Sequence, residues 1–289
     1  MAEFLTLLFS EGKQVGTIRN YRSAISSVHR GFADGSTLSN NELISRLLKG
    51  MFNRRPPVRR LPPSWSINDV LRKLQDPPFE PLCSATLEHL TSKTLFLIAA
   101  ASARRRSELH ALSTKEGFIR FDPAGVRLLP DPQFLSKNQS ASFTPREIYL
   151  PALKEMSSVP EDKLWCPVRA LRWYLEKTRA VRTSDRLFIL PRSPYSAASK
   201  DTLSKWLVKV ITPHTTPGEG VRAHDIRGHA TSKAWFARVP LDDIMRAAAW
   251  KTPSTFVSSY LTNTVSAEAA FASSVLRAPG SSLPVLPPQ

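Results

Sequence analysis

The sequence predicts a mostly α-helical protein with a small antiparallel β-sheet, an α+β fold in two domains. Apolar residues recur at helical spacing over most of its 289 residues. Between residues 118 and 150 they form short runs bounded by Gly, Pro, Asp and Asn, which is typical of strands. A stretch rich in proline and arginine around residue 60 separates a short N-terminal part from a longer one.

Residues 1–53 are expected to form a helical domain. Four apolar residues fall on one helical face: Ile18, Tyr21, Ile25 and Val28. A polar stripe occupies another face: Arg19, Ser23, Ser26 and Arg30. Such a stripe can lie along phosphates or can be an ordinary solvated face, and the spacing alone favours neither.

Residues 54–64 are expected to form a linker. The stretch from Arg54 to Pro63 holds four prolines, which disfavour a helix, and four arginines, which disfavour burial. These arginines are Arg54, Arg55, Arg59 and Arg60.

Residues 65–276 are expected to form the larger domain. Ser66 is suited to cap a helix that runs through Leu74, and residues 90–112 show one long apolar helical pattern. Four strands are predicted next: Phe118–Phe121, Val126–Leu129, Gln133–Ser136 and Glu147–Leu150. Helices are then predicted at Pro167–Ala180, Lys200–Ile211, Ile226–Phe236, Leu241–Ala248, Pro253–Leu261 and Ser266–Leu276. Residues 277–289 are rich in Pro, Gly and Ser and predict a disordered tail.

The chain is strongly basic. It has 40 Lys and Arg against 24 Asp and Glu, a formal net charge of +16. A charge of this size predicts a polyanionic partner, although charge also serves solubility. Nucleic acid is favoured over a membrane, because no stretch approaches the ~20 consecutive apolar residues of a membrane span. Residues 1–10 lack the basic start of a signal peptide, so we expect a soluble protein that is not exported.

The two cysteines, Cys83 and Cys166, stand far apart, and neither has a partner at metal-ligand spacing. A zinc site and a disulfide framework are therefore not expected. We expect a reducing intracellular compartment instead.

Three consecutive arginines at positions 104–106 directly follow an apolar run on what is expected to be one helix. At least one of them must then face inward. Arg105 shares a helical face with Leu109 and Leu112, so its guanidinium is expected to head for the core, where Glu108 can hold it. A buried arginine needs an anion, which can be a ligand or a structural partner such as Glu108.

His224 and Arg227 form a His-x-x-Arg pair where a loop is expected to enter a helix. Free N–H groups and the positive end of the helix dipole attract phosphate there, and arginine adds a planar fork for two phosphate oxygens. One helix further on, Trp250 precedes Tyr260 by ten residues. A helical tyrosine taken alone is ordinarily a core residue.

The order of these motifs resembles the tyrosine recombinase (phage integrase) family: Arg-x-Ser-Glu-Leu, then His-x-x-Arg, then Trp ten residues before Tyr. Residues 221–260, with Ala-His-Asp-Ile-Arg-Gly, Ala-Ala-Trp and Ser-Thr-Phe-Val, are similar in particular to recombinases of DIRS-type retrotransposons. The resemblance covers roughly residues 65–275. Residues 1–53 match more loosely the family's DNA core-binding domain, for which they are short.

The resemblance implies a site-specific recombinase or integrase that cleaves and rejoins DNA strands, as in the integration of a mobile element. Six residues receive catalytic roles by position: Arg105, Lys137, His224, Arg227, Trp250 and Tyr260. Tyr260 would attack the phosphorus to form a 3′-phosphotyrosine, while the two arginines bind the non-bridging oxygens. Lys137 would protonate the departing 5′-oxygen, His224 would assist proton transfer, and Trp250 would buttress the phosphate. Because the phosphotyrosine conserves the bond energy, neither a metal nor any other cofactor is required.

The lysine is the least specified of these residues. The family carries it on a β-hairpin between the two arginine motifs, and Lys137 lies at the turn between two predicted strands. Lys115 and Lys154 are the alternatives, both outside that turn.

The implied partners are double-stranded DNA and further copies of the chain, two on each DNA site and four in the synapse. Neither a membrane nor a small-molecule substrate is expected, and in a eukaryotic host the protein would act in the nucleus. The helix at 266–276 can dock on a neighbouring copy or on its own subunit. Further DNA contacts are assigned to Arg19, Ser23, Arg30, Arg54, Arg55, Arg59 and Arg60.

Two alternatives stay open from the sequence. One is a catalytically silent DNA-binding regulator derived from a recombinase, against which the presence of all six catalytic candidates argues. The other is a type IB topoisomerase, against which the DIRS-like motif spacing argues.

Overall fold

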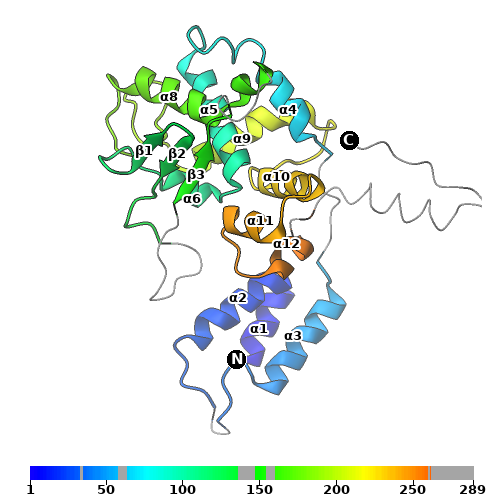
Figure 1. Ribbon diagram of the computed structural model, residues 1–289. Coiled ribbons are helices and arrows are strands. Elements are labelled where there is room, and N and C mark those ends of the chain that lie inside the picture. The colour runs from blue at the N-terminus through cyan, green and yellow to red at the C-terminus, as the bar shows by residue number, and fades with distance from the viewer. Residues whose placement is uncertain (33–34, 58–63, 136–146, 154–159, 260, 262–289) are drawn as a thin grey trace, which may run out of the picture. The chain divides into compact units, whose positions relative to one another are not determined.

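The structure is a computed structural model that describes residues 1–32, 35–57, 64–135, 147–153, 160–259 and 261 (Figure 1). The chain divides into two compact units, which we call unit 1 (Met1–Pro62) and unit 2 (Pro63–Gln289). No helix within the described residues combines the length and the apolar character that crossing a bilayer requires.

Unit 1 contains, within its described residues, three helices: α1 (Ala2–Ser10), α2 (Val15–Ser26) and α3 (Glu42–Arg54). They enclose one small apolar core: Leu5, Leu8, Val15, Ile18, Leu38, Ile44, Leu48 and Met51. Asn41 caps α3, because its side chain accepts a hydrogen bond from the Ile44 N–H at 3.1 Å. The N-terminal part is therefore helical, as predicted, and α3 continues one residue into the predicted linker.

The predicted apolar face of α2 is right in its first half and wrong in its second. Ile18 is buried and Ile25 half-buried, but Tyr21 and Val28 are exposed. The helix ends at Ser26, where consecutive serines offer the backbone other hydrogen bonds; the Ser27 hydroxyl donates to the Ala24 carbonyl at 2.7 Å. Val28 and the last residue of the polar stripe, Arg30, consequently lie beyond the helix.

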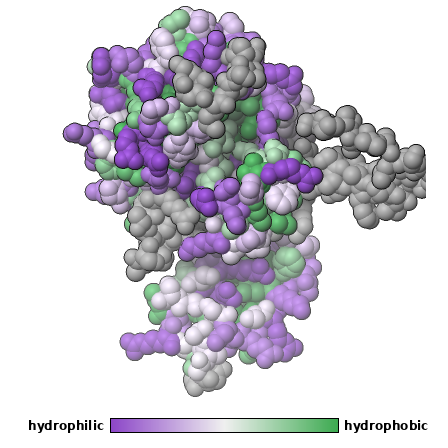
Figure 2. All heavy atoms as spheres, in the orientation of Figure 1, coloured by the Kyte–Doolittle hydropathy of each residue, from purple (hydrophilic) through white to green (hydrophobic). Residues whose placement is uncertain are grey.

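Unit 2 is mainly helical. Within its described residues the α-helices are α4 (Ile67–Lys73), α5 (Leu87–Ser102), α6 (Arg106–His110), α8 (Pro167–Thr178), α9 (Lys200–Ile211), α10 (Asp225–Phe236), α11 (Leu241–Ala247) and α12 (Pro253–Ser259). Short 3₁₀ helices span Pro160–Trp165 (η1) and Thr212–His214 (η2). Hydrophilic side chains cover much of the face of unit 2 that Figure 2 shows.

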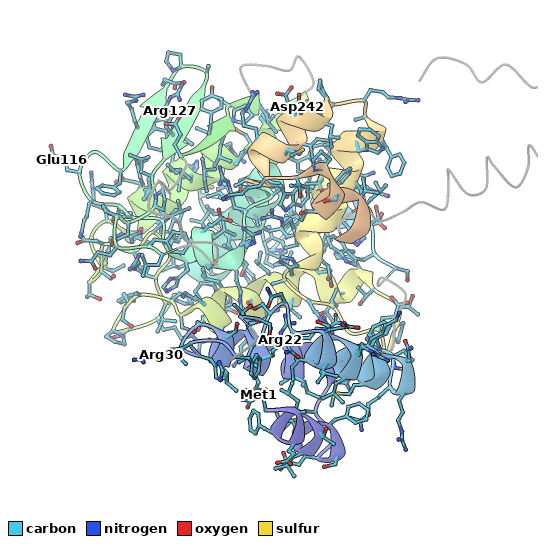
Figure 3. The ribbon with its side chains drawn as sticks, turned by 90° about the horizontal axis from the view of Figure 1, so that it is seen from below. Met1, Arg22, Arg30, Glu116, Arg127 and Asp242 are labelled. Carbon is cyan, nitrogen blue, oxygen red and sulfur yellow. The ribbon has the colours of Figure 1, made fainter. Side chains whose placement is uncertain are left out.

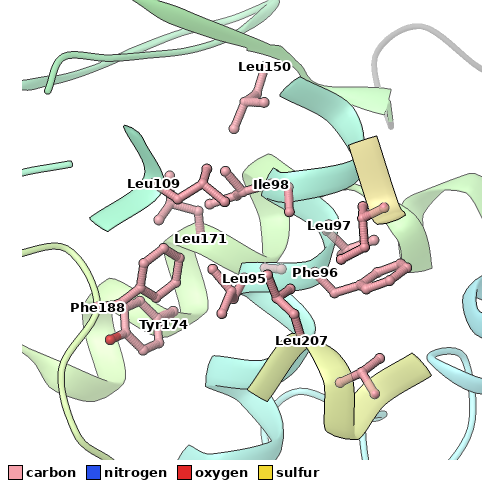
Figure 4. Packing of buried hydrophobic residues seen from close by; sticks show 14 of the residues in the cluster. Leu95, Phe96, Leu97, Ile98, Leu109, Leu150, Leu171, Tyr174, Phe188 and Leu207 are labelled. Atoms are coloured by element: carbon pink, nitrogen blue, oxygen red, sulfur yellow. The ribbon is translucent and has the colours of Figure 1, made fainter. Parts of the chain in front are cut away.

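Helix α5 is the centre of the unit 2 core. It is buried along most of its length, and it packs against α8, α9 and α10 (Figure 4). Leu95 and Ile98 of α5 face Leu171 and Tyr174 of α8 in this core. The Tyr174 hydroxyl accepts the Ile189 N–H at 3.0 Å, and burial raises the pKa of this tyrosine. The core therefore holds α5 against α8 and α9.

Most predicted helices of unit 2 are confirmed. Helix α9 has the predicted bounds, and α8, α10, α11 and α12 differ from theirs by one or two residues at one end. Ser66 caps α4 by accepting the Asn68 N–H at 3.2 Å, as predicted. The helix predicted at 266–276 lies outside the described residues, as does the tail.

The single helix predicted over residues 90–112 is wrong. Helix α5 ends at Ser102, and Ala103 follows in the left-handed conformation with φ 48°. A second helix, α6, then begins with Arg105 as its N-cap. The new start is stabilised by the Glu108 carboxylate, which accepts the Arg105 N–H at 2.8 Å. Apolar periodicity continues across the break and therefore does not reveal it.

The sheet, as far as the structure describes it, has three antiparallel strands in the order β1 (Ile119–Asp122), β2 (Gly125–Leu128) and β3 (Ile148–Pro151). Val126 pairs with Leu150, and both are buried against the core. Gly125 opens β2 because a Cβ there would collide with the Leu150 carbonyl oxygen. Arg127, on the other face of β2 (Figure 3), donates to the Glu147 carboxylate at 2.6 Å.

The strand predicted at Gln133–Ser136 is wrong over Gln133–Leu135, which form a turn and an irregular segment. The Asp131 side chain accepts the Gln133 N–H, and its carbonyl accepts the Phe134 N–H, both at 2.9 Å. An aspartate that binds backbone N–H groups two and three residues on favours a turn over an extended strand. Residues 133–135 are therefore not a β-strand.

A half-buried imidazole of α10 packs against the start of unit 2. The ring of His229 stacks on Trp65 with the two centroids 4.0 Å apart. Its Nε2 has no hydrogen-bond partner among the described residues, and burial lowers the pKa of His229 to about 4. The folded chain therefore favours the neutral form of this ring.

We expect acidification to destabilise unit 2 through His229. The unfolded chain binds a proton there below about pH 6.5, but the folded chain does so only near pH 4. The stability that the neutral ring contributes above about pH 6.5 is thus lost as the pH falls toward 4. Between about pH 7.5 and about pH 5, urea unfolding of the wild type should lose up to about 2 kcal/mol more than that of His229→Phe. Equal losses in the two proteins would contradict a neutral imidazole with a buried Nε2.

Candidate functional site

Unit 2 contains a cavity of about 760 Å³ between the end of α5, α6, α9 and the start of α10. Basic side chains and one imidazole line it: Arg104, Arg105, Arg106, Lys200, Arg222, His224 and Arg227. None of the described residues that line it is acidic. We call it the basic cavity, and its charge makes it suited to bind an anion.

Arg105 enters the basic cavity from the N-cap of α6, and it is half-buried. The prediction that Glu108 holds the Arg105 guanidinium is wrong. The Glu108 carboxylate instead accepts the backbone N–H of Arg105 and pairs with the guanidinium of Arg104. The Arg105 backbone is therefore fixed at the edge of the cavity.

Arg104, rather than Arg105, is the most deeply buried of the three consecutive arginines. Its side chain is 6% exposed, and its Nη1 lies 3.2 Å from Glu108 Oε1. The helix break at Ala103 is the reason, because positions on the two sides of the break no longer share one helical period. The signal in the sequence was the spacing of four residues between Arg104 and Glu108, which suits an ion pair.

Arg227 lies in the first turn of α10 and is 2% exposed. Its Nη2 donates to the Ala248 carbonyl at 2.5 Å, and its Nη1 lies 3.9 Å from Glu108 Oε2. The guanidinium carbon is 4.6 Å from the centre of the Trp250 ring, a cation–π contact. Arg227 thus joins α10 to α6 and to the segment between α11 and α12, and it lines the basic cavity.

His224 is the N-cap of α10, which confirms that the His-x-x-Arg pair stands at a helix entry. The side chain is exposed and lines the basic cavity. The loop before it is fixed by Asp225, whose carboxylate accepts the Arg222 N–H at 2.7 Å. Burial raises the pKa of Asp225, and this hydrogen bond opposes the rise.

Trp250 lies between α11 and α12 and is buried. It follows Ala249, a left-handed residue with φ 50°, and its backbone N–H donates to the Met245 carbonyl at 2.9 Å. The indole ring contacts Arg227, and it also lies 5.6 Å from the Phe256 ring between centroids. Trp250 is therefore placed to hold the Arg227 guanidinium.

The structure brings Arg105, His224 and Arg227 to one cavity and sets Trp250 against Arg227. Of the other predicted catalytic residues, Tyr260 and Lys137 lie outside the described residues. So does the alternative Lys154, whereas Lys115 is exposed and does not line the basic cavity. Among the described residues, no cluster of His, Cys, Asp and Glu could hold a metal ion.

The residues predicted to contact DNA outside the catalytic motifs fall into three groups. The exposed ones are Arg19, Ser23, Arg30 and Arg54, and Figure 3 labels Arg30 among the side chains of unit 1. Arg59 and Arg60 lie outside the described residues. Arg55 is half-buried and holds the end of α1: its guanidinium donates to the Phe9 and Lys13 carbonyls at 2.9 and 3.1 Å. It also lies 4.0 Å from the Phe9 ring centre, so its contacts are structural.

No family model matches the chain, and no curated protein matches it in sequence. Solved structures match its fold. The Tn1549 transposon integrase, in complex with transposon right end DNA, has a TM-score of 0.58 and 11% identity over 96% of this chain and 84% of that one. The XerH site-specific recombinase in a post-cleavage complex with palindromic difH substrate has a TM-score of 0.56 and 16% identity. This match covers 94% of this chain and 71% of that one. The pre-cleavage complex of XerH with difH has a TM-score of 0.52 and 16% identity, and the match covers 94% of this chain and 68% of that one.

This likeness shows the fold. The chain has the mostly helical architecture with a small antiparallel sheet of site-specific recombinases and integrases, and the fold class predicted from the sequence is confirmed.

Proposed function

We propose that the chain is a tyrosine-type DNA strand transferase, a site-specific recombinase that cleaves and rejoins DNA. One observation carries the proposal: the basic cavity collects Arg105, His224 and Arg227 from two motifs that lie over a hundred residues apart. The fold shared with XerH and the Tn1549 integrase supports it.

The cavity suits the chemistry of a phosphodiester. The scissile phosphate is a monoanion that gains negative charge in a pentacoordinate transition state, so fixed donors on its non-bridging oxygens lower the barrier. Arg105 and Arg227 each carry a positively charged guanidinium, which donates from a planar fork. Arg227 is also held by Ala248 and Trp250, so little reorganisation is needed when the charge develops.

Tyr260 is proposed as the nucleophile on the sequence motif. Its phenolic oxygen would form a bond to phosphorus while the bond to the 5′-oxygen breaks, with Lys137 giving that oxygen its proton. His224, at the entry of α10, would move the proton of the tyrosine. Attack of a 5′-hydroxyl from another strand would reverse these steps and complete the exchange.

The proposed partner is double-stranded DNA, and the proposed assembly is two copies of the chain on each site and four in the synapse. The XerH structure contains palindromic difH substrate and that of the Tn1549 integrase contains transposon right end DNA, which supports DNA as the partner. We also propose a DIRS-type retrotransposon as the source and a nuclear location in its host. The motifs between residues 221 and 260 support this origin.

The test is incubation of the protein with DNA nicked within a candidate element terminus, followed by denaturing electrophoresis. A protease-sensitive band of protein joined to DNA is expected. Binding with no such band on any element-derived substrate would favour the catalytically silent regulator. In a parallel incubation with an intact supercoiled plasmid, relaxation without strand exchange would favour a topoisomerase.

DNA affinity is expected to fall by ~10³-fold or more between about 50 and about 200 mM salt, because each phosphate that lysine or arginine contacts releases a condensed counterion. Fluorescence anisotropy with a labelled duplex measures this slope. The expectation follows from the formal charge of +16 and from the residues of the basic cavity. A flat salt response would count against DNA as the partner.

A further inference from the structure

Arg104 lies between two cavities. It lines the basic cavity and also a second cavity of about 740 Å³, whose lining includes Glu147, Tyr149 and Arg246. None of the catalytic roles implied by the motifs falls on Arg104. Its near-complete burial therefore needs an explanation of its own.

The Arg104 guanidinium joins two separate elements. On one side Nη1 contacts Glu108 of α6 at 3.2 Å; on the other Nη2 donates to the Glu147 carbonyl, directly before β3, at 3.1 Å. Glu147 is itself held on the sheet, since its carboxylate accepts a hydrogen bond from Arg127 of β2. Arg104 thus ties the start of α6 to the sheet.

The Glu108 carboxylate lies close to three arginines. One oxygen contacts the Arg104 guanidinium, and the other accepts the Arg105 N–H at 2.8 Å and lies 3.9 Å from Arg227 Nη1. The side chain is 14% exposed, so solvent screens these charges only weakly. If Arg104 were absent, this carboxylate would pair more closely with Arg227 and compete with an incoming anion.

We propose that Arg104 is a positioning residue of the basic cavity. It holds the Glu108 carboxylate so that Glu108 fixes the Arg105 backbone without neutralising Arg227. Anion binding in the cavity follows from the charges alone, whereas the effect on DNA cleavage rests on the proposed function.

The first experiment compares Arg104→Met with the matched control Arg179→Met. Arg179 is a surface residue at the end of α8, where it pairs with Glu176 at 3.0 Å. We expect Arg104→Met to slow single-turnover DNA cleavage by about 10- to 100-fold, less than the loss of a direct phosphate donor. Its duplex affinity should stay within about 3-fold of the wild type, because the side chain is buried. The control should match the wild type in both.

A double-mutant cycle with Glu108→Gln tests whether Arg104 acts through that carboxylate. In the Glu108→Gln background, the further change Arg104→Met should alter the cleavage rate by less than about 2-fold. Full additivity of the two losses would overturn the proposed route. A general loss of packing would show such additivity, so the cycle separates positioning from a merely structural role.

Inorganic phosphate provides a readout that does not need cleavage. Phosphate that binds the folded cavity raises the unfolding temperature of the full chain. The rise should be smaller in Arg104→Met than in the wild type and in Arg179→Met. If the wild type forms no covalent complex but this difference is seen, the proposed function fails and the positioning role stands. The positioning role would be overturned if phosphate stabilised Arg104→Met as much as the wild type and the variant also cleaved DNA at the wild-type rate. It would equally be overturned if phosphate did not stabilise the wild type.

If Arg104→Met does not fold, Arg104→Lys is the variant that tests the positioning role. Lysine keeps the positive charge near Glu108 but offers no planar fork that reaches both acceptors. We expect it to show the same losses in part. Wild-type cleavage and phosphate stabilisation in Arg104→Lys would overturn the bridging role.

Discussion

Tyr260→Phe is expected to abolish the covalent protein–DNA complex, to below about 10⁻³ of the wild-type amount, while duplex affinity stays within about 3-fold. The substitution removes one oxygen atom and keeps the ring. Without the phenolic oxygen no bond to phosphorus can form, whereas the arginines of the basic cavity remain to bind the phosphate. Denaturing electrophoresis of end-labelled nicked DNA measures the complex, and anisotropy with the same duplex measures binding.

The other tyrosines supply the controls. Tyr149 on β3 is partly exposed, so Tyr149→Phe should form the covalent complex at the wild-type rate. Tyr174 is not suited to attack DNA, because it is buried and its hydroxyl accepts the Ile189 N–H. A complex that persists in Tyr260→Phe would assign the nucleophile to another residue.

The sequence predicts helices well where one apolar face meets one core. Helix α9 has the predicted bounds, and its apolar positions Leu203, Leu207, Val210 and Ile211 are all buried in one core. The prediction fails at residues 103–105, where the chain leaves one helix and starts another. That break depends on a left-handed alanine and on a carboxylate three residues after Arg105, and neither leaves a trace in the apolar period. The strand predicted at Gln133 fails for a similar local reason, the turn made by Asp131.

The candidate site is predictable where the order of motifs carries it. His224 stands at a helix entry and Arg227 shares the cavity with Arg105, as expected from residues that bind one phosphate. Trp250 packs on the Arg227 guanidinium, a contact that was not predicted, and its role in buttressing the phosphate stays a prediction. The burial of Arg104 was not predicted, because it depends on the helix break at Ala103. The prediction assumed one continuous helix, in which Arg105 would face the core. What the sequence order leaves open is therefore which neighbouring arginine contacts the ligand and which supports it.

Arg227→Lys is expected to lower the single-turnover rate of DNA cleavage by about 10²- to 10³-fold, although the charge is kept. The guanidinium makes three contacts at fixed angles: it donates to the Ala248 carbonyl, it lies near Glu108 Oε2, and it stacks on the Trp250 ring. An ammonium group is a single point of charge and cannot keep these contacts and still present two parallel donors to a phosphate.

The decisive comparison is with Arg179→Lys, which makes the same exchange on the surface of α8 and should cleave at the wild-type rate. Arg227 is almost fully buried, so the unfolding temperature of each variant must also be measured. Cleavage is then compared at a temperature below the unfolding temperatures of both variants. Suppose that Arg227→Lys cleaves within about 3-fold of the wild type. The reacting phosphate would then not depend on the Arg227 fork, and the basic cavity would bind its anion through Arg105 and the exposed residues of its rim instead.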